Sequence, residues 1–374
     1  MRRQPVSVGF LGAGNVLWAY LRTLDVLIAS GEAVLGGICA RSAARRRELK
    51  RARPAVPLVT TVEALLAGRP DVVVVITPPD SHAALARAAL EAGCHVLVEK
   101  PLATNADSAR ALVQFAARRN RHLVAAPFTH LAPTFALLRS LIHSGAIGHL
   151  HSARALYGNA GSSWASWYHA SRVGPLAEIG IYNLKSLVAL LGPVCQIDHW
   201  ERRSGLLRHV RGRRIRRPDP DVSHTLLEHA GGAISTLSSS HAIVRYDRPA
   251  LEIYGTRGTA NLLGDDWDPR GVDLWRAGRG CWERYPAIEP TWHWTDGLTD
   301  LVRAVRTRRA PLANADLDLH LLDVLEAAVA AARSRRVVEI ARTARWKRAA
   351  QLPMPHVRIA ARSLHDHTRP SDQQ

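Results

Sequence analysis

The sequence predicts an α/β protein with two domains: a doubly wound parallel sheet, followed by an α+β domain with an open, largely antiparallel sheet. The first domain is predicted because fully apolar segments alternate with helical segments up to about residue 128. Such strands, separated by helices, are typical of a parallel sheet covered on both faces. The second domain is predicted because later segments alternate apolar and polar residues, as half-buried strands do.

The elements of the first domain, residues 1–128, follow one another in a regular order. The segment VSVGFL alternates and then becomes apolar, the β-branched segment DVVVVITPP stops at prolines, and the Ala-rich segment HAALARAALEAG ends at Gly93. The expected strands are 6–11, 33–40, 71–79, 94–98 and 122–128, and the expected helices are 16–28, 42–52, 61–67, 82–93 and 105–119.

The second domain, residues 129–340, begins with a helix that ends at Gly145 and closes with another helix. Gly231-Gly232 is expected to form a hairpin turn. The expected helices are 132–144, 175–191 and 316–335, and the expected strands are 149–157, 194–201, 222–229 and 233–241, with hairpins in 250–262 and 272–286. The basic tail, residues 341–374, has no periodicity and is expected to be loosely ordered or to wrap the surface.

Composition excludes several classes of protein. The net charge is +18, but only four of the 50 basic residues are lysines, so nucleic-acid binding is not the favoured explanation of the charge. The four cysteines are scattered without a metal-ligand spacing, which predicts no metal site and a reducing, cytoplasmic location. No apolar run approaches the roughly 20 residues of a membrane span. The first residues resemble a secretion leader, but their strand–turn–helix pattern favours part of the fold.

The glycine pair Gly12 and Gly14 lies between a strand and a helix, and Asn15 follows it. In that context, glycine allows a tight turn and a close backbone approach, and the helix N-terminus favours the charge of a pyrophosphate. The pattern predicts a dinucleotide-binding turn. Leu17 occupies the third glycine position, which is a departure from the usual small residue.

The end of the second strand indicates which dinucleotide is preferred. Sites for NAD usually place an acidic residue there, which binds the ribose 2′-hydroxyl. This chain has Arg41 and Ser42 in that region and no acid, so both residues are predicted to hold the 2′-phosphate of NADP. The alternatives are NAD as cofactor, and Arg41 as one more solvated arginine.

Three ordered motifs, FLGAGN near the start, ITPPDSH at 76–82 and GCHVLVEKPLA at 93–103, resemble the Gfo/Idh/MocA family of nicotinamide-dependent oxidoreductases. The segments GPLAEIGIYNLKSL at 174–187 and LEIYGTRGTANL at 251–262 agree with it. The resemblance implies a Rossmann domain, then a substrate domain, and redox chemistry on sugars, inositols or related cyclic polyols. It also implies a homodimer or homotetramer, whereas the lack of a membrane-length apolar run predicts no association with membranes.

The resemblance assigns the Glu99-Lys100-Pro101 motif to the nicotinamide side of the site. Lys100 takes the position beside the nicotinamide and the reacting substrate oxygen, where an ammonium group stabilises a developing alkoxide. Pro101 is expected to follow a cis peptide bond, and Glu99 to anchor the turn or reach the cofactor. Further cofactor contacts are expected from residues that follow the preceding strand: Thr77, Pro78 and His82.

The second family motif usually carries an Asp and a His four residues apart on a helix. This chain has Glu178 and Tyr182 instead, and branches that resemble glucose-fructose oxidoreductase and dihydrodiol dehydrogenase carry Tyr in place of His. The resemblance therefore makes Tyr182 the general acid/base, with Glu178 orienting Lys100 or substrate hydroxyls and Lys185 on the same helix face. The alternative is that Tyr182 is a core residue and Glu178 a favourable charge at the helix N-terminus.

Two further groups of residues have either a functional or a structural role, and the sequence does not decide between them. Trp164, Trp167, Tyr168 and His169 suit a sugar ring but equally suit packing, and the arginines of 202–217 suit an anionic substrate group or a solvated loop. The chain is thus predicted to be an NADP- or NAD-dependent dehydrogenase or reductase acting on CH–OH groups. The alternative functions are a non-catalytic cofactor-binding sensor and, less favoured, a nucleic-acid-binding protein.

Overall fold

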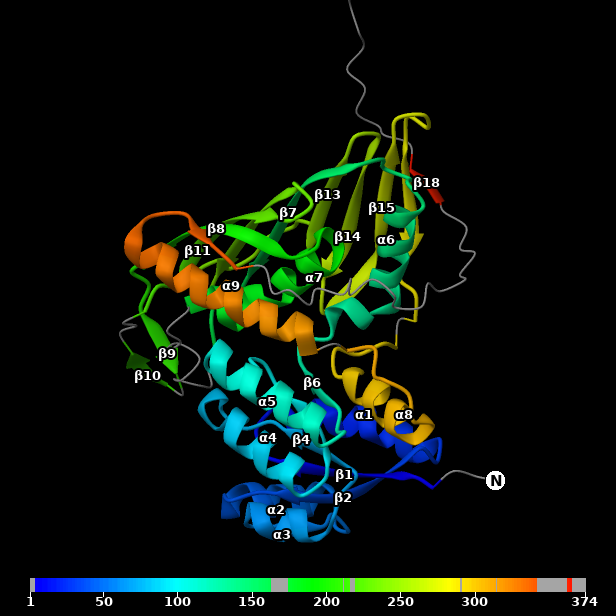
Figure 1. The fold of residues 1–374 in the computed structure, drawn as a ribbon, viewed down its shortest axis with the longest axis vertical. Coiled ribbons are helices and arrows are strands. Elements are labelled where there is room, and N and C mark those ends of the chain that lie inside the picture. The colour runs from blue at the N-terminus through cyan, green and yellow to red at the C-terminus, as the bar shows by residue number, and fades with distance from the viewer. Residues whose placement is uncertain are drawn as a thin grey trace, which may run out of the picture. The chain divides into compact units, whose positions relative to one another are not determined.

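The computed structural model describes residues 4–162, 174–210, 212–215, 219–289, 291–313, 315–341 and 362–364. The chain divides into two compact units. Unit 1 contains Met1–Leu131 and His293–Leu322, and unit 2 contains Ala132–Trp292 and Asp323–Gln374. Sequence analysis assigned 129–340 to the second domain and did not predict the return of residues 293–322 to unit 1 (Figure 1).

Unit 1 is built on a six-stranded parallel sheet in the order β3-β2-β1-β4-β5-β6, which confirms the predicted doubly wound fold. Its strands are β1 (Val6–Leu11), β2 (Ala33–Cys39), β3 (Leu58–Val59), β4 (Val72–Val75), β5 (His95–Val98) and β6 (Leu123–Ala125). Strands β4 and β6 are shorter than the expected 71–79 and 122–128. The prolines that follow them lack an N–H for the hydrogen-bond ladder.

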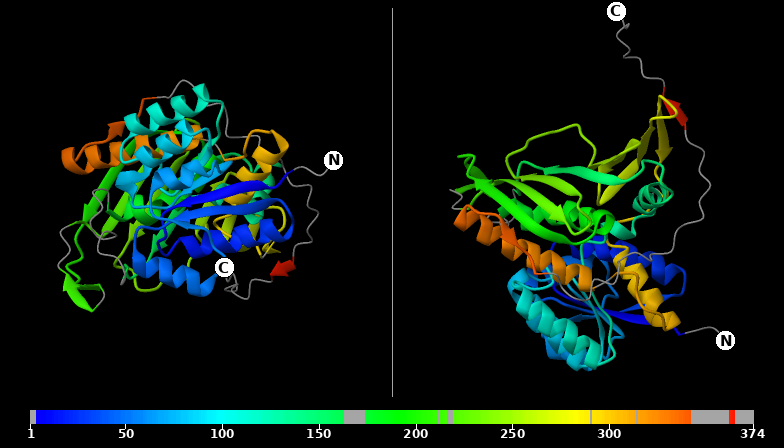
Figure 2. Two further views of the ribbon diagram at one scale, coloured as in Figure 1. Left: turned by 90° about the horizontal axis from the view of Figure 1, so that it is seen from below. Right: turned by 45° about the horizontal axis from the view of Figure 1, so that its top comes forward.

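Helices cover both faces of this sheet (Figure 2). They are α1 (Leu17–Ala29), α2 (Ala43–Ala52), α3 (Val62–Ala67), α4 (His82–Glu91) and α5 (Ala106–Arg118). Helices α4 and α5 pack on each other on one face. On the other face, the side chains of Val72 and Val74 join one core cluster with the apolar side of α1.

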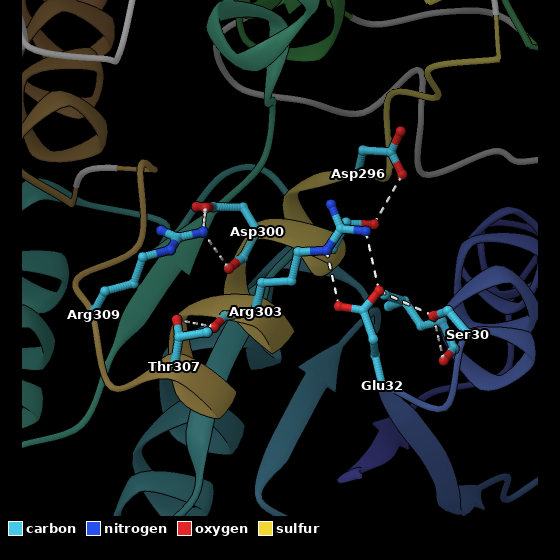
Figure 3. Close-up of polar contacts among 9 residues, drawn as sticks. Ser30, Glu32, Asp296, Asp300, Arg303, Thr307 and Arg309 are labelled. Carbon is cyan, nitrogen blue, oxygen red and sulfur yellow. Dashed lines mark hydrogen bonds and ion pairs between the residues drawn. The ribbon is translucent and has the colours of Figure 1, made fainter. Parts of the chain in front are cut away.

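The returning helix α8 (Gly297–Thr307) completes that second face, because its Leu298, Leu301 and Val302 belong to the same core cluster. There α8 packs on β1 and β5, and a parallel sheet is stable only when both faces are buried. Polar contacts fasten the returning segment (Figure 3). Arg303 donates to both oxygens of Glu32 at 3.0 and 3.1 Å, and Asp300 accepts from Arg309 at 2.7 Å.

Unit 2 contains a ten-stranded sheet in the order β17-β8-β11-β12-β7-β13-β14-β15-β16-β18. Among the described strands, the pair β7–β12 is parallel and every other pair is antiparallel, as predicted. The strands are β7 (Leu150–Gly158), β8 (Val194–Arg202), β11 (Val222–His229), β12 (Ile234–Ser240), β13 (Leu251–Gly255), β14 (Gly258–Asp265), β15 (Asp268–Arg276), β16 (Trp282–Pro286), β17 (Val338–Glu339) and β18 (Arg362–Leu364).

Three helices and a ribbon accompany this sheet. Helix α6 (Pro133–His143) packs on β14 and β15, α7 (Ile181–Leu191) packs on β7 and β12, and α9 (Ala315–Ser334) runs from unit 1 into unit 2. Within the expected arginine loop, β9 (Arg208–Val210) pairs with β10 (Arg213–Ile215). The tail was expected to be loosely ordered or to wrap the surface, and of it the structure describes residues 341 and 362–364, the latter as the edge strand β18.

Candidate functional site

The carboxyl ends of the five main strands of unit 1 lie level at one edge of the sheet. Leu11 pairs with Cys39 and with Val75, Val75 pairs with Val98, and Val98 pairs with Ala125. The residues that follow these strand ends are therefore neighbours, although the chain separates them widely. The structure thus brings the predicted residues around Gly12, Arg41, Thr77 and Lys100 to the edge where parallel α/β sheets bind ligands.

The two glycines of the turn after β1 have different reasons to be glycine. Gly12 has φ +111°, and a Cβ there would lie 2.9 Å from the carbonyl oxygen of Ile76, so the fold itself requires glycine. Gly14 is exposed, and a Cβ there would meet no atom within 4 Å. Packing within the described residues therefore does not require glycine at this position.

The first turn of α1 carries no negative charge that would repel an anion. No side chain of the described residues caps this helix and the turn holds no acidic residue, although the backbone N–H groups of Leu17 and Ala19 already donate to the carbonyl oxygens of Gly14 and Val16 at 3.2 and 3.1 Å. Leu17, which replaces the third glycine, is fully buried in the core cluster. Leu17 therefore packs into the core beneath the turn. Its larger side chain does not cover the exposed side of the turn.

At the end of β2, Arg41 and Ser42 are both exposed. The Ser42 hydroxyl accepts a hydrogen bond from the backbone N–H of Arg45 at 3.3 Å and so caps α2. The Arg45 guanidinium donates to Asn15 Oδ1 at 3.0 Å and to Glu48 at 2.8 Å. Arg45 thereby links Asn15 in the glycine turn to the start of α2. Arg45 was not among the predicted site residues.

After β4, Thr77 is half-buried and Pro78 is exposed. The Thr77 hydroxyl accepts from Ser81 Oγ at 2.7 Å. His82, which was predicted to contact the cofactor, is 1% exposed and has other partners. Its Nε2 lies 2.8 Å from the carbonyl oxygen of Thr77 and its Nδ1 lies 2.7 Å from that of Pro101. Its ring therefore joins the loop after β4 to the loop after β5.

After β5, Glu99 is buried, and Lys100 and Pro101 are half-buried. The Lys100–Pro101 peptide bond is cis, as predicted. Glu99 Oε1 accepts from the Tyr20 hydroxyl at 2.8 Å, and Glu99 Oε2 accepts from the Lys100 backbone N–H at 3.2 Å. Of the two roles expected for Glu99, these contacts correspond to anchoring the turn. The sequence did not predict a role for Tyr20, because a single tyrosine on the apolar face of α1 is indistinguishable from an ordinary core residue.

In unit 2, the other candidate residues lie where a π-helical turn, Leu176–Gly180, leads into α7. Such turns widen the helix and are frequent at functional sites. Gly180 separates Glu178 from Tyr182, and a Cβ on it would lie 2.2 Å from Ser239 Oγ of β12. Glycine therefore lets the turn approach the sheet closely. No feature of the sequence distinguishes this π turn from an ordinary helical turn.

The side chains on this segment differ in exposure. Glu178 is 7% exposed and Lys185 is fully buried, whereas Tyr182 is half-buried, with its ring centroid 6.0 Å from that of Tyr157 on β7 at an angle of 72°. An edge-to-face contact of this kind orients an aromatic side chain. Tyr182 is thus both held by β7 and open to contact from outside.

Behind α7 lies a fully buried carboxyl group that sequence analysis missed, Asp266. The Ser186 hydroxyl donates to its Oδ2 at 2.9 Å. Burial raises the pKa of the Asp266 carboxyl to about 7, although hydrogen bonds from Ser186 and Asn183 act in the opposite direction. The residue lies between β14 and β15, in a sequence, Gly264-Asp265-Asp266-Trp267, that reads as a solvated turn.

One predicted group of site residues cannot be placed in the structure. The aromatic group Trp164, Trp167, Tyr168 and His169 lies outside the described residues. Within the described ranges, no three His, Cys, Asp or Glu side chains come together as metal ligands. A search of the same residues finds no helix with the length and apolar character needed to cross a membrane.

Comparison with known proteins covers both units. Residues 6–126 match the family described as the Gfo/Idh/MocA oxidoreductase family with an NAD-binding Rossmann fold, and residues 135–261 match the C-terminal domain of the same family. These matches extend over most of the described chain.

Two curated relatives have names that specify a reaction. The chain is 30% identical over 265 residues to a dTDP-3,4-didehydro-2,6-dideoxy-α-D-glucose 3-reductase of Saccharopolyspora spinosa, covering 68% of this chain and 74% of the relative. It is 30% identical over 262 residues to a trans-1,2-dihydrobenzene-1,2-diol dehydrogenase of Oryctolagus cuniculus, covering 69% and 76%. A levoglucosan dehydrogenase solved with NADH and levoglucosan shares the fold, with a TM-score of 0.78 at 20% identity, over 90% of this chain and 100% of that chain.

Proposed function

Because this chain belongs to the Gfo/Idh/MocA family of NAD-binding oxidoreductases, we propose that it transfers a hydride between a nicotinamide and a carbon of a sugar, inositol or related cyclic polyol. The reacting carbon is a secondary alcohol in one direction and a carbonyl in the other. The names of the reductase and dehydrogenase relatives support this substrate class. The observation that carries the proposal is Lys100, placed after β5 at the same sheet edge as the glycine turn.

The dinucleotide would lie along that edge. Gly12, Gly14 and Asn15 would hold the pyrophosphate against the first turn of α1, and Thr77, Pro78, Glu99, Lys100 and Pro101 would surround the nicotinamide end, with His82 behind them. When bound, the nicotinamide would supply the hydride acceptor or donor. We propose NADP over NAD because Arg41 and Ser42 are exposed where an NAD site usually has an acid.

Two side chains are proposed to handle the proton. Lys100 would stabilise the negative charge that develops on the substrate oxygen, and Tyr182 would exchange the proton of the hydroxyl. A free tyrosine has a pKa near ~10, so a nearby cation would match its pKa better to neutral pH. Glu178, close to Tyr182 on the same helical segment, would orient the cation or the substrate hydroxyls.

The test uses one variant in each unit. Lys100→Ala and Tyr182→Phe are each expected to lower kcat by roughly 10²- to 10⁴-fold in a screen of sugars and polyols. Both should keep the thermal stabilisation by NADP⁺, about 2.7 kcal/mol at 100 times the dissociation constant. Full turnover of a folded Lys100→Ala protein would exclude this mechanism.

Cofactor preference is tested by melting the protein with NADP⁺, NAD⁺ or neither. A shift with NADP⁺ that Arg41→Ala removes supports the proposed 2′-phosphate contact, whereas an equal shift with NAD⁺ contradicts it. A cofactor-dependent shift without turnover on any polyol would favour the second candidate function, a non-catalytic NADP- or NAD-binding sensor. Retention of Lys100 favours the enzyme.

We further propose a homodimer or homotetramer in the cytoplasm. Cys39, Cys94 and Cys195 form no disulfide, which supports a reducing compartment. Light scattering during size-exclusion chromatography measures the number of chains, and a monomer at micromolar concentration would contradict the proposed assembly.

A further inference from the structure

We infer that Tyr20 and His82 are positioning residues that hold the backbone on either side of Lys100, so that the direction of its ammonium group is set before any ligand binds. The inference deepens the proposed function, since it rests on the role proposed there for Lys100. It is carried by two hydrogen bonds, one to each oxygen of Glu99, and by the short contacts of the two His82 ring nitrogens with carbonyl oxygens, to one of which a neutral imidazole donates.

The first holding point lies before Lys100, at Glu99. This side chain is only 8% exposed, and it joins two groups: the hydroxyl of Tyr20 at 2.8 Å and the backbone N–H of Lys100 at 3.2 Å. A buried carboxylate is stable only while donors satisfy its oxygens. Loss of the Tyr20 hydroxyl would free Glu99 to rotate, and the Lys100 peptide would lose its acceptor.

Tyr20 is itself fixed by residues that come from far along the chain. It is fully buried, and its ring lies 5.9 Å from that of Trp294, at an interplanar angle of 76°. One turn later on α1, Thr23 shares a hydrogen bond of 2.6 Å with Thr295, which is also fully buried. His293 Nδ1 lies 2.7 Å from the Thr295 hydroxyl. The segment that returns to unit 1 therefore packs on the helix face that supports Glu99.

The second holding point lies after Lys100, at Pro101. The ring of His82 is 1% exposed and lies between the carbonyl oxygens of Pro101 and Thr77, at 2.7 and 2.8 Å. The ring stands at the first residue of α4 and is almost completely buried, so packing restricts its rotation. The backbone of Lys100 thus lies between the Glu99 carboxylate, which Tyr20 of α1 contacts, and the Pro101 carbonyl, which His82 of α4 contacts. Neither Tyr20 nor His82 needs to touch the substrate to affect its reaction, because small displacements of a catalytic group are costly.

The experiment uses the low lysine content of the chain, which has only Lys50, Lys100, Lys185 and Lys347. Protein labelled with ¹³C at the lysine ε-carbon gives four signals, and Lys100→Arg identifies the one that belongs to Lys100. The variant is Tyr20→Phe, which removes one oxygen and keeps the ring packing against Trp294. Tyr254→Phe is the matched control, because Tyr254 also bonds a glutamate, Glu252, but lies in unit 2.

In Tyr20→Phe, the Lys100 signal should shift and its titration midpoint should move, while the Lys50 and Lys185 signals stay in place. With a polyol substrate, kcat should fall on the order of 10- to 100-fold, with KM for the cofactor changed less than about 2-fold. Tyr254→Phe should leave all four signals and kcat unchanged. His82→Asn, whose shorter side chain reaches only one carbonyl, should shift the same Lys100 signal.

Different results would contradict the positioning role of Tyr20 and His82 and the proposed function. An unchanged Lys100 signal and unchanged kcat in folded Tyr20→Phe and His82→Asn proteins, together with an inactive Lys100→Ala, would overturn the positioning role and leave the proposed function intact. Full activity of Lys100→Ala would overturn the proposed function, whereas the resonance of Lys100, which needs no substrate, would still report whether Tyr20 and His82 hold it. If melting shows that Tyr20→Phe is unfolded, His82→Asn decides the inference alone.

Discussion

In unit 1 the candidate residues lie in loops at the ends of parallel strands, whereas in unit 2 they lie on one helix that packs on a mixed sheet. The loops of unit 1 are held by short contacts from buried side chains to backbone, as at His82 and Glu99. The helix of unit 2 has a fully buried carboxyl, Asp266, behind it, and burial raises the pKa of this group to about 7.

The two units therefore differ in how they accommodate buried polar groups. In unit 1 the buried side chains of Glu99 and His82 near the strand ends have short contacts to the backbone of the neighbouring loops. In unit 2 an acid is placed where its charged form is disfavoured, so the stability of that unit should depend on pH. The following predictions test this contrast and the role of the returning helix.

The largest effect is expected from Leu301→Ala on α8. Leu301 is fully buried in the core cluster of unit 1, so truncation should cost about 2–5 kcal/mol of unfolding free energy. Denaturant unfolding measures the loss. Val26→Ala on α1, where Val26 is 69% exposed, is the control and should change stability by less than about 0.5 kcal/mol. Equal effects of the two variants would mean that α8 is not part of the unit 1 core.

Asp266→Asn tests the buried acid of unit 2. The carboxyl pKa rises from 3.8 to about 7 on folding, so the stability that its protonated form contributes is complete below pH 3.8 and is lost as pH rises towards 7. The loss is on the order of 4 kcal/mol at most, at 1.36 kcal/mol per pKa unit. The variant should therefore be more stable than the parent protein at pH 8 and similar to it at pH 4.

The control for this prediction is Asp268→Asn, which removes an exposed carboxyl from the same strand pair. It should show no such pH dependence in a series of urea unfolding curves between pH 4 and 8. A constant difference between Asp266→Asn and the parent protein across that range would contradict the proposed titration.

Gly12→Ala and Gly14→Ala test whether the two glycines of the turn serve the fold or cofactor binding. Alanine at position 12 must adopt φ +111° and approach the Ile76 carbonyl, so it should cost about 1–3 kcal/mol of stability in the absence of cofactor. Alanine at position 14 enters open space and should leave the melting temperature unchanged, yet it should weaken cofactor binding by about tenfold, or 1.4 kcal/mol. Calorimetric titration with NADP⁺ separates the two effects, and unaltered binding by Gly14→Ala would contradict the proposed pyrophosphate position.

The smallest effect is expected from Arg303→Met, which removes the ion pair to Glu32. Arg303 is 53% exposed, so the pair should contribute only about 0.2–1 kcal/mol. The hydrogen bond from Arg303 lowers the pKa of Glu32, so this contribution is present above pH 4.5 and is lost as pH falls through the lowered value. Arg22→Met, at an exposed α1 position, is the control, and a larger loss at pH 3 than at pH 7 would contradict the assignment.

The sequence by itself determined the fold class and the order of nearly all helices and strands, and it pointed to the glycine turn, because apolar periodicity, glycine and proline act on the backbone within a few residues. The Glu99-Lys100-Pro101 motif was selected through the resemblance to a family. Only the tertiary structure decided that residues 293–322 return to unit 1, that Tyr20 holds Glu99, and that Asp266 is buried behind α7. Those contacts join residues 79 to 272 positions apart or depend on burial, and neither is encoded in any short stretch of the chain.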